Sequence, residues 1–332
     1  MQIVDLRQIP SRLLDALFEE EQQRWLEELH WDYRPSVQLI RKFIEAKSLA
    51  GFAVLDRSNG AGGGAGTAAL GRGAAAPRVA GYGFYVVEES KGLIGDLFVS
   101  GHYPKQPVAR QILEEMLATL RAVPHLGRIE SQLIPFGMVL DETLAELGFR
   151  LHPRQFMMLP LARAQFQAAP VTSGLRIEPW DDRHFEACAQ LIFQAYDGHV
   201  DSEINDQYHS EPGAMKFLKN IIILPGCGTF LPEASFVVRP IASDRLVAVV
   251  LASSVSHGVG HTTQICILPG YRGHGLGLRL MEASIRALVS LRFHALSLTV
   301  TSANEKAVRL YERLGFNTLK TFAAAIWKNP DA

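Results

Sequence analysis

Three glycines separate a short apolar segment from a segment with helical spacing in the second half of the chain. The run reads "LPGYRGHGLGLRLM" over residues 268–281, with Gly273, Gly275 and Gly277 at alternate positions. Glycine adopts backbone conformations closed to other residues and exposes its N–H groups to a ligand. The following helix adds unpaired N–H donors and the positive end of its dipole, which suit a phosphate or pyrophosphate. The run therefore predicts a phosphorylated ligand, with Arg272 as an added positive charge.

Three known glycine patterns can be compared with this run. The Walker pattern ends in Gly-Lys-Ser/Thr, which this run does not have. The dinucleotide fingerprint would start at Gly273 and Gly275, but its third glycine is replaced by Leu278, and the preceding strand is late in the domain. The pattern R-x-x-G-x-G fits Arg272 to Gly277 without adjustment.

A second motif, N-x-x-A-x-x-L-Y-x-x-x-G-F, runs from Asn304 to Phe316. With both motifs in this order, the second half resembles the GNAT superfamily of acyl-CoA-dependent N-acetyltransferases. The resemblance covers residues 175–328 well and residues 1–161 only weakly. It implies transfer of an acetyl group from acetyl-CoA, the acyl-donor substrate, to a primary amine on a small-molecule or peptide acceptor, by direct attack in a ternary complex.

The resemblance also assigns roles to residues. Tyr311 is the candidate catalytic acid that protonates the departing thiolate, and Asn304 approaches the thioester with it. The residues expected to bind acetyl-CoA are the strand residues Ile265, Cys266 and Ile267 along the pantetheine arm, the loop residues Arg272, Gly273, His274, Gly275, Leu276 and Gly277 around the pyrophosphate, and Asn304 and Ala307.

The residue that deprotonates the amine stays open. Many relatives carry a glutamate on the strand before the loop, around Thr263 or Gln264, and neither residue can act as a base. His257, His261 or a water chain could replace it, or the acceptor could be a weakly basic amine. The polar run at 197–211 borders the acceptor site in such enzymes and could select a cationic acceptor. The missing carboxylate also leaves an alternative function, a non-catalytic acyl-CoA-binding regulatory module.

The elements around these motifs follow the order βααβββαβαβ in the second half, which predicts an α+β fold with a mixed, mostly antiparallel sheet flanked by helices. The first half repeats it: residues 96–117 align with 264–285 at an offset of 168, and 140–149 with 307–316 at 167. We therefore predict two tandem GNAT-like domains. They are a degenerate one at 1–161 with a flexible Gly/Ala insert at 58–77, a linker at 162–174, and a catalytic one at 175–332.

The degenerate copy has lost the features of an acyl-CoA site. Pro107 and Ala109 stand where Gly275 and Gly277 do, and Leu144 stands where Tyr311 does. Because proline removes a backbone donor, this half is expected not to bind acyl-CoA in the usual way but to pack against the catalytic half or shape its acceptor pocket.

Composition narrows the remaining functions. Lys and Arg number 33 against 34 Asp and Glu, so no bulk positive charge favours nucleic acid. No apolar run approaches a membrane span and the N-terminus does not resemble a signal peptide, so we expect a cytoplasmic protein without membrane contact. Cys188, Cys227 and Cys266 are widely spaced, which predicts reduced core thiols and no metal site. The sequence indicates no oligomeric state.

Overall fold

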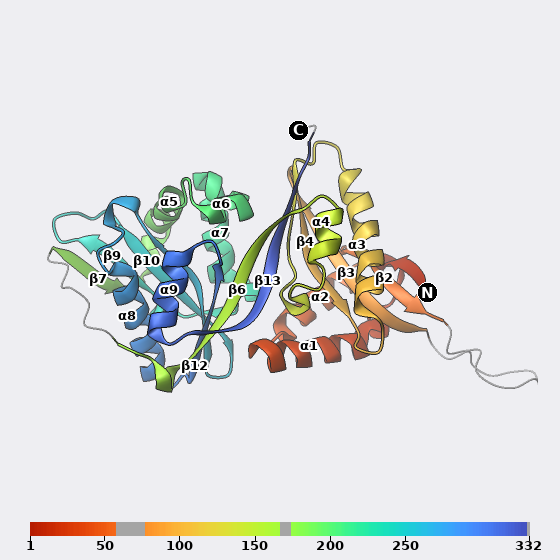
Figure 1. The fold of residues 1–332 in the computed structure, drawn as a ribbon, viewed down its shortest axis with the longest axis horizontal. Helices are drawn as coiled ribbons and strands as arrows, with labels where there is room; N and C mark the ends of the chain where they lie inside the picture. Colours follow the sequence, from red (N-terminus) through yellow and green to blue (C-terminus); the bar gives the residue numbers. More distant parts are fainter. Residues whose placement is uncertain (58–76, 167–173, 331–332) are drawn as a thin grey trace, which may run out of the picture. The chain divides into compact units, whose positions relative to one another are not determined.

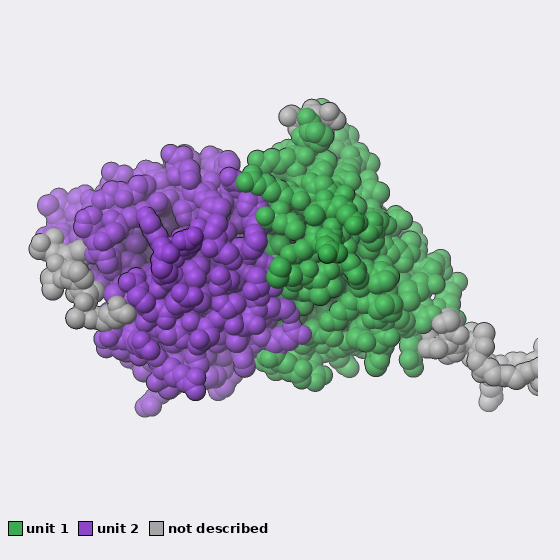
Figure 2. Space-filling model, viewed as in Figure 1, with its two compact units in different colours: residues 1–27, 33–151, 323–332 green, residues 28–32, 152–322 purple. Residues whose placement is uncertain are grey.

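The chain forms two compact units (Figure 2). In this computed structural model the described residues are 1–57, 77–166 and 174–330. Unit 1 comprises Met1–Glu27, Tyr33–Leu151 and Ala323–Ala332, and unit 2 comprises Glu28–Asp32 and His152–Phe322. Most of the predicted insert and half of the predicted linker, residues 58–76 and 167–173, lie outside the described residues. Within the described ranges, no helix has the length and apolar content needed to cross a lipid bilayer.

Unit 1 is a sheet with helices packed on both faces (Figure 1). Its strands, in spatial order, are β1 (Gln2–Asp5), β2 (Ala50–Asp56), β3 (Arg78–Glu88), β4 (Lys91–Val99), β5 (Arg128–Gln132) and the end of β13 (Asn317–Lys328). Its helices are α1 (Asp15–Leu29), α2 (Arg34–Glu45), α3 (Lys105–Arg121) and α4 (Asp141–Glu146). Along β2, Val54 packs on the α3 side while Ala53 and Leu55 pack on the α1 and α2 side, as the twofold period of a strand requires.

Unit 2 has the same architecture around one continuous core. Its strands, in spatial order, are β6 (Arg150–Pro160), β12 (Ala295–Thr301), β11 (Val259–Ile267), β10 (Ala248–Ser256), β9 (Phe236–Pro240) and β7 (Leu175–Pro179), with β8 (Thr229–Phe230) on β10. Its helices are α5 (Phe185–Ala195), α6 (Val200–Ile204), α7 (Glu211–Ile223), α8 (Leu276–Ser290) and α9 (Glu305–Leu314). The predicted element order is observed, with α6 and β8 as additions.

The strand registers confirm the internal repeat. Strands β4 and β5 pair in parallel from Lys91–Arg128 to Ile94–Ser131, and β11 and β12 pair in parallel from Val259–Ala295 to Thr262–Leu298. The two ladders are therefore offset by 168 residues (259 − 91) and 167 residues (295 − 128), the offsets found in the sequence. The pairings β1–β2, β2–β3, β3–β4, β5–β13, β6–β12, β10–β11, β9–β10 and β7–β9 are antiparallel, so each unit has a mixed, mostly antiparallel sheet.

Each unit is completed by a strand from the other half of the sequence. Strand β6 precedes the predicted linker but pairs antiparallel with β12 of unit 2. The last strand, β13, follows all of unit 2, and its residues Ala324–Lys328 pair antiparallel with β5 of unit 1. Neither half of the sequence therefore contains the complete sheet of one unit.

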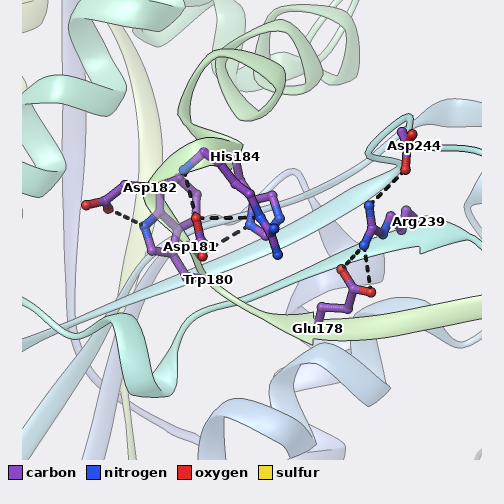
Figure 3. A network of polar contacts seen from close by, with 8 residues as sticks. Glu178, Trp180, Asp181, Asp182, His184, Arg239 and Asp244 are labelled. Carbon is purple, nitrogen blue, oxygen red and sulfur yellow. Dashed lines mark hydrogen bonds and ion pairs between the residues drawn. The ribbon is translucent and has the colours of Figure 1, made fainter.

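Polar contacts beside the edge strand β7 fix the start of α5 (Figure 3). The backbone N–H of Asp181 donates to Nδ1 of His184 at 3.2 Å, and the Asp181 carboxylate caps the short 3-10 turn that leads into α5. Glu178 of β7 forms an ion pair with Arg239 of β9 at 2.8 Å. The Asp181 cap therefore fixes the residue at which the helical segment leading into α5 begins.

Candidate active site

Strands β11 and β12 stop pairing where the predicted site begins. Their parallel register ends at the Thr262–Leu298 pair, although β11 continues to Ile267. On its other side β11 remains paired with β10, and Leu268 N–H donates to Val247 C=O at 2.9 Å. Backbone groups alternate in direction along an antiparallel strand, so those of Ile265 and Ile267 face away from β10. This is the orientation that the pantetheine prediction requires.

The glycine loop positions the N-terminus of α8 after this strand. Gly273 and Gly275 have φ values of 83° and 77°, in the left-handed region that favours glycine. Gly275 caps α8 without a side-chain hydrogen bond, and the first intrahelical bond is that of Arg279 to Gly275 at 3.1 Å. The N–H groups of the residues between them therefore lie before the hydrogen-bonded turns. His274 is exposed, and Leu276 is buried under the loop.

Arg272 braces the loop through its side chain. Its Nε donates to Ile267 C=O at 3.0 Å and its Nη2 donates to Ala195 C=O at 2.5 Å, which ties the loop to β11 and to the end of α5. Gly277 is also structural: a Cβ there would lie 3.2 Å from Leu310, so α8 packs closely against α9. The guanidinium of Arg272, which the sequence predicts as an added positive charge, is therefore engaged in hydrogen bonds that hold the loop to β11 and α5.

Asn304 and Tyr311 lie on α9, as the second motif predicts. Asn304 is the N-cap of α9, with its Oδ1 accepting from Ala307 N–H at 3.3 Å. Tyr311 is 5% exposed, and burial together with the negative charge of Asp201 raises the pKa of its hydroxyl. Tyr311 therefore carries its proton at neutral pH. The exposed face of α9 also borders a cavity of about 470 Å³, which is lined by Lys306, Arg309, Glu312 and Arg313.

Two tyrosines face the strand position where many relatives carry a carboxylate. Tyr196 donates from its hydroxyl to Oε1 of Gln264 at 3.0 Å, and its ring stacks on Tyr208 at 3.9 Å. Burial raises the pKa of both hydroxyls, so both stay protonated. Tyr208 lies in the polar run at 197–211, which is helical and partly buried rather than a solvated loop.

The same run supplies residues that the sequence did not single out. His199 is the N-cap of α6, with its Nδ1 accepting from Asp201 N–H at 3.2 Å, and its Nε2 lies 3.3 Å from Nδ2 of Asn304. Asp201 accepts a short hydrogen bond from the Thr301 hydroxyl at the end of β12. The sequence shows a histidine two residues before an aspartate in this run. Because His199 is far from Asn304 along the chain, no local pattern in the sequence predicts the contact between them.

The two histidines considered as bases lie elsewhere. His261 is buried, its Nδ1 contacts the Ser297 hydroxyl at 2.8 Å, and burial lowers its pKa to about 3. His257 is exposed in the turn before β11, about 30 Å from the glycine loop at the other end of that nine-residue strand. Cys266 belongs to the core, where burial raises its thiol pKa to about 12.

Part of the chain is similar in sequence to known proteins. Residues 200–316 match the acetyltransferase (GNAT) family. A mycothiol acetyltransferase from Propionibacterium freudenreichii subsp. shermanii is 28% identical over 184 residues, which cover 54% of this chain and 55% of that relative. N-alpha-acetyltransferase 30 from Schizosaccharomyces pombe is 34% identical over 89 residues, covering 26% of this chain and 58% of that relative. The chain thus spans a little over half the length of these two relatives.

Solved structures extend the likeness to the whole chain. A GCN5-related N-acetyltransferase from Sphaerobacter thermophilus has a TM-score of 0.67 at 12% identity, covering 98% of this chain and 95% of that one. A tandem GNAT protein from the clavulanic acid biosynthesis pathway has a TM-score of 0.57 at 13% identity, covering 98% of both chains. At these identities the likeness shows the fold alone, and it confirms the predicted tandem GNAT architecture.

Proposed function

We propose, from the match of residues 200–316 to the acetyltransferase (GNAT) family, that this chain transfers an acetyl group from acetyl-CoA to a primary amine of a small-molecule or peptide acceptor. The observation that carries the proposal is the position of the glycine loop. It places uncapped helix N–H groups of α8 directly after the end of β11, where β11 no longer pairs with β12. Asn304 and Tyr311 lie on α9, whose Leu310 packs closely against Gly277 of α8. Catalysis is assigned to residues 175–332, and residues 1–161 form the degenerate copy.

The residues present suit acetyl-CoA as the donor substrate. The N–H groups at residues 273–277 and the positive end of the α8 dipole suit the pyrophosphate, whereas the N–H of Arg272 already donates to Pro269 C=O at 3.2 Å. The backbone groups of Ile265 and Ile267 suit the amide-containing pantetheine arm, although the carbonyl of Ile267 already accepts from Arg272.

The chemistry is direct attack of the amine nitrogen on the thioester carbonyl. Most of the acceleration comes from holding both reactants in place, where effective molarities reach about 10⁵–10⁸ M. Tyr311 remains protonated because it is buried, so its hydroxyl can donate a proton to the departing thiolate. The raised thiol pKa of buried Cys266 argues against a covalent acyl-cysteine.

A second candidate function is non-catalytic acyl-CoA binding, which the neutral Gln264 on β11 favours. Acetyl-CoA consumption separates the two, with an aminosugar, an alkyl diamine and a peptide bearing a free α-amino group as acceptors. We expect turnover with wild type and a fall of about 10²-fold or more in kcat with Tyr311→Phe. Tyr103→Phe, at a tyrosine of unit 1 whose hydroxyl donates to Asp56 at 3.1 Å, is the control for loss of a tyrosine hydroxyl outside the candidate site. Saturable acetyl-CoA binding without turnover on any acceptor would favour the binding module.

A further inference from the structure

We propose that His199 accepts the proton released by the attacking amine and that Asp201 positions and balances the charged imidazole. This inference rests on the proposed acetyl transfer and names the base that the sequence left open. It places the base on the connection between α5 and α6 instead of on β11.

The contacts of His199 place it at the candidate active site. Its Nε2 faces the Asn304 side chain at 3.3 Å, at the start of the helix that carries Tyr311. Its ring packs edge-on against Tyr196 at a centroid distance of 5.2 Å, and the Tyr196 hydroxyl bonds to Gln264. His199 therefore stands one side chain away from the strand position at which many relatives carry glutamate.

Accessibility distinguishes His199 from its neighbours. Tyr196, Tyr208 and Gln264 are each at most 8% exposed, so an acceptor cannot reach them without displacing other groups. The side chains of His199 and Asp201 are 21% and 19% exposed. An amine, or a water molecule bound to it, can thus approach the imidazole from solvent.

The environment of His199 favours the neutral ring that a base requires. Burial lowers its pKa, and the positive charge of Arg272 lowers it further, whereas the carboxylate of Asp201 opposes this shift. Two N–H groups face the ring, from the Asp201 backbone and the Asn304 amide. A neutral imidazole has one lone pair to offer them. In the structure this lone pair is at Nδ1, which accepts the Asp201 N–H. The ring acts as the base in its other tautomer, with the proton on Nδ1 directed toward the Asp201 carboxylate and the lone pair at Nε2, on the Asn304 side.

Asp201 is the positioning residue. Its Oδ2 lies 3.7 Å from Nδ1 of His199, and its Oδ1 accepts the hydrogen bond from Thr301 on β12. This carboxylate therefore balances the charge when the imidazole takes a second proton. Its charge also contributes to the raised pKa of Tyr311, which keeps the acid protonated while the base is neutral.

The proposed step balances in atoms and charge. The protonated amine gives one proton to Nε2 of His199, its nitrogen bonds to the thioester carbon, and the carbon–sulfur bond breaks. The thiolate takes a proton from Tyr311, and the nitrogen loses a second proton, which returns to Tyr311 through solvent. His199 then releases its proton to water. The products are the N-acetyl amine, coenzyme A and one proton.

The kinetic test compares His199→Gln with His257→Gln, an exposed histidine remote from the loop, on whichever panel amine supports turnover. We expect the wild-type kcat/KM to rise with pH to a plateau set by a group with a pKa below 6.5. In His199→Gln, kcat/KM for the amine should be about 10–10²-fold lower than in wild type at pH 7, and the KM for acetyl-CoA should be unchanged. This kcat/KM should then rise about tenfold per pH unit, because the fraction of unprotonated amine increases with pH.

The control variant His257→Gln should have the same kcat/KM and pH profile as wild type. If the pH profile of kcat/KM is unchanged in His199→Gln while Tyr311→Phe loses turnover, the role of His199 is wrong but the proposed acetyl transfer stands. Lack of turnover with every amine overturns both.

A titration by NMR of histidine-labelled chain saturated with acetyl-CoA provides a readout that needs no acceptor. The resonance missing in His199→Gln should titrate below pH 6.5. In Asp201→Asn it should titrate at still lower pH, because the balancing charge is gone. A His199 pKa at or above 6.5, or one unaffected by Asp201→Asn, contradicts the proposal.

Discussion

Tyr196 donates its hydroxyl to Gln264 at 3.0 Å in unit 2, and a related bond is present in unit 1. There Tyr33 donates to Asp96 at 2.5 Å, and Asp96 precedes Gln264 by 168 residues, the offset of the repeat. Both bonds link a tyrosine after the first helix region to the same strand position. Unit 1 has an acid at this position and unit 2 an amide, so only unit 1 carries an ionisable side chain there.

The Tyr196–Gln264 bond predicts a stability effect. Tyr196→Phe leaves the buried Gln264 oxygen without its partner and should lower the free energy of unfolding by about 1–3 kcal/mol. Adding Gln264→Leu should recover part of this loss, since both polar groups are then gone. Urea denaturation of the two single variants and the double variant checks this. Additive losses in the double variant would contradict the coupling.

Gly275→Ala should weaken acetyl-CoA binding at least tenfold and destabilise the fold by about 1 kcal/mol, because Gly275 has a left-handed φ of 77° in the loop. Gly174→Ala, at φ 89° with open space around its Cβ position, is the matched control for backbone strain alone. Calorimetry with acetyl-CoA should show normal affinity in Gly174→Ala. Equal affinity of both variants for acetyl-CoA would mean that the glycine loop is not part of the acetyl-CoA site.

The buried acids of unit 1 predict a loss of stability as the pH rises above about 4. Glu21 and Asp96 are 0% and 3% exposed, and the Tyr82 hydroxyl donates to Glu21 at 2.8 Å. Burial raises the pKa of both carboxyls above their unfolded values. Their stabilising contribution is therefore complete below about pH 4 and is lost as pH rises through the folded pKa, by about 1.4 kcal/mol per pH unit for one proton.

Glu21→Gln tests this prediction, because its amide does not titrate. Between pH 5 and pH 8 the melting temperature of wild type should fall relative to that of Glu21→Gln. Glu114→Gln, at an exposed ion pair on α3, should track wild type. Parallel pH profiles for wild type and Glu21→Gln would mean that the acid does not take up a proton on folding.

His261 predicts a loss of stability at acid pH. Its pKa is lowered to about 3 by burial, so it stays neutral in the fold but gains a proton when unfolded below its ordinary value near 6.5. The stability it contributes is present above pH 6.5 and is lost as pH falls. At pH 4.5 wild type should have lost roughly 2–3 kcal/mol relative to His261→Gln, compared with the difference at pH 7.5. Urea midpoints of the two proteins at both pH values measure this, and a constant difference would contradict it.

Cys266 should be dispensable for chemistry. Its thiol pKa of about 12 leaves almost no thiolate at neutral pH. We expect Cys266→Ala to retain kcat within about threefold. Mass spectrometry of wild type incubated with acetyl-CoA alone should detect no acetylated cysteine. An acetyl-cysteine at residue 266 would instead establish a covalent route.

Local sequence signals predicted the elements around the loop well. Glycines at 273 and 275, an asparagine cap at 304 and apolar residues at helical spacing act over a few residues, so they appear in the sequence as they do in the structure. The repeat could be predicted for a similar reason. Its offset preserved the order of strands, and the two parallel ladders show the same offset.

The sequence by itself determined the family motifs, the tandem α+β architecture and the position of the glycine loop, because each depends on short-range pattern. Only the tertiary structure decided that β6 and β13 complete sheets of the units formed by the opposite half of the chain. It also brought His199 to Asn304, 105 residues away, and Asp201 to Thr301, 100 residues away. These contacts arise from the packing of α5, α6, β12 and α9 around one core, and no local spacing in the chain encodes them.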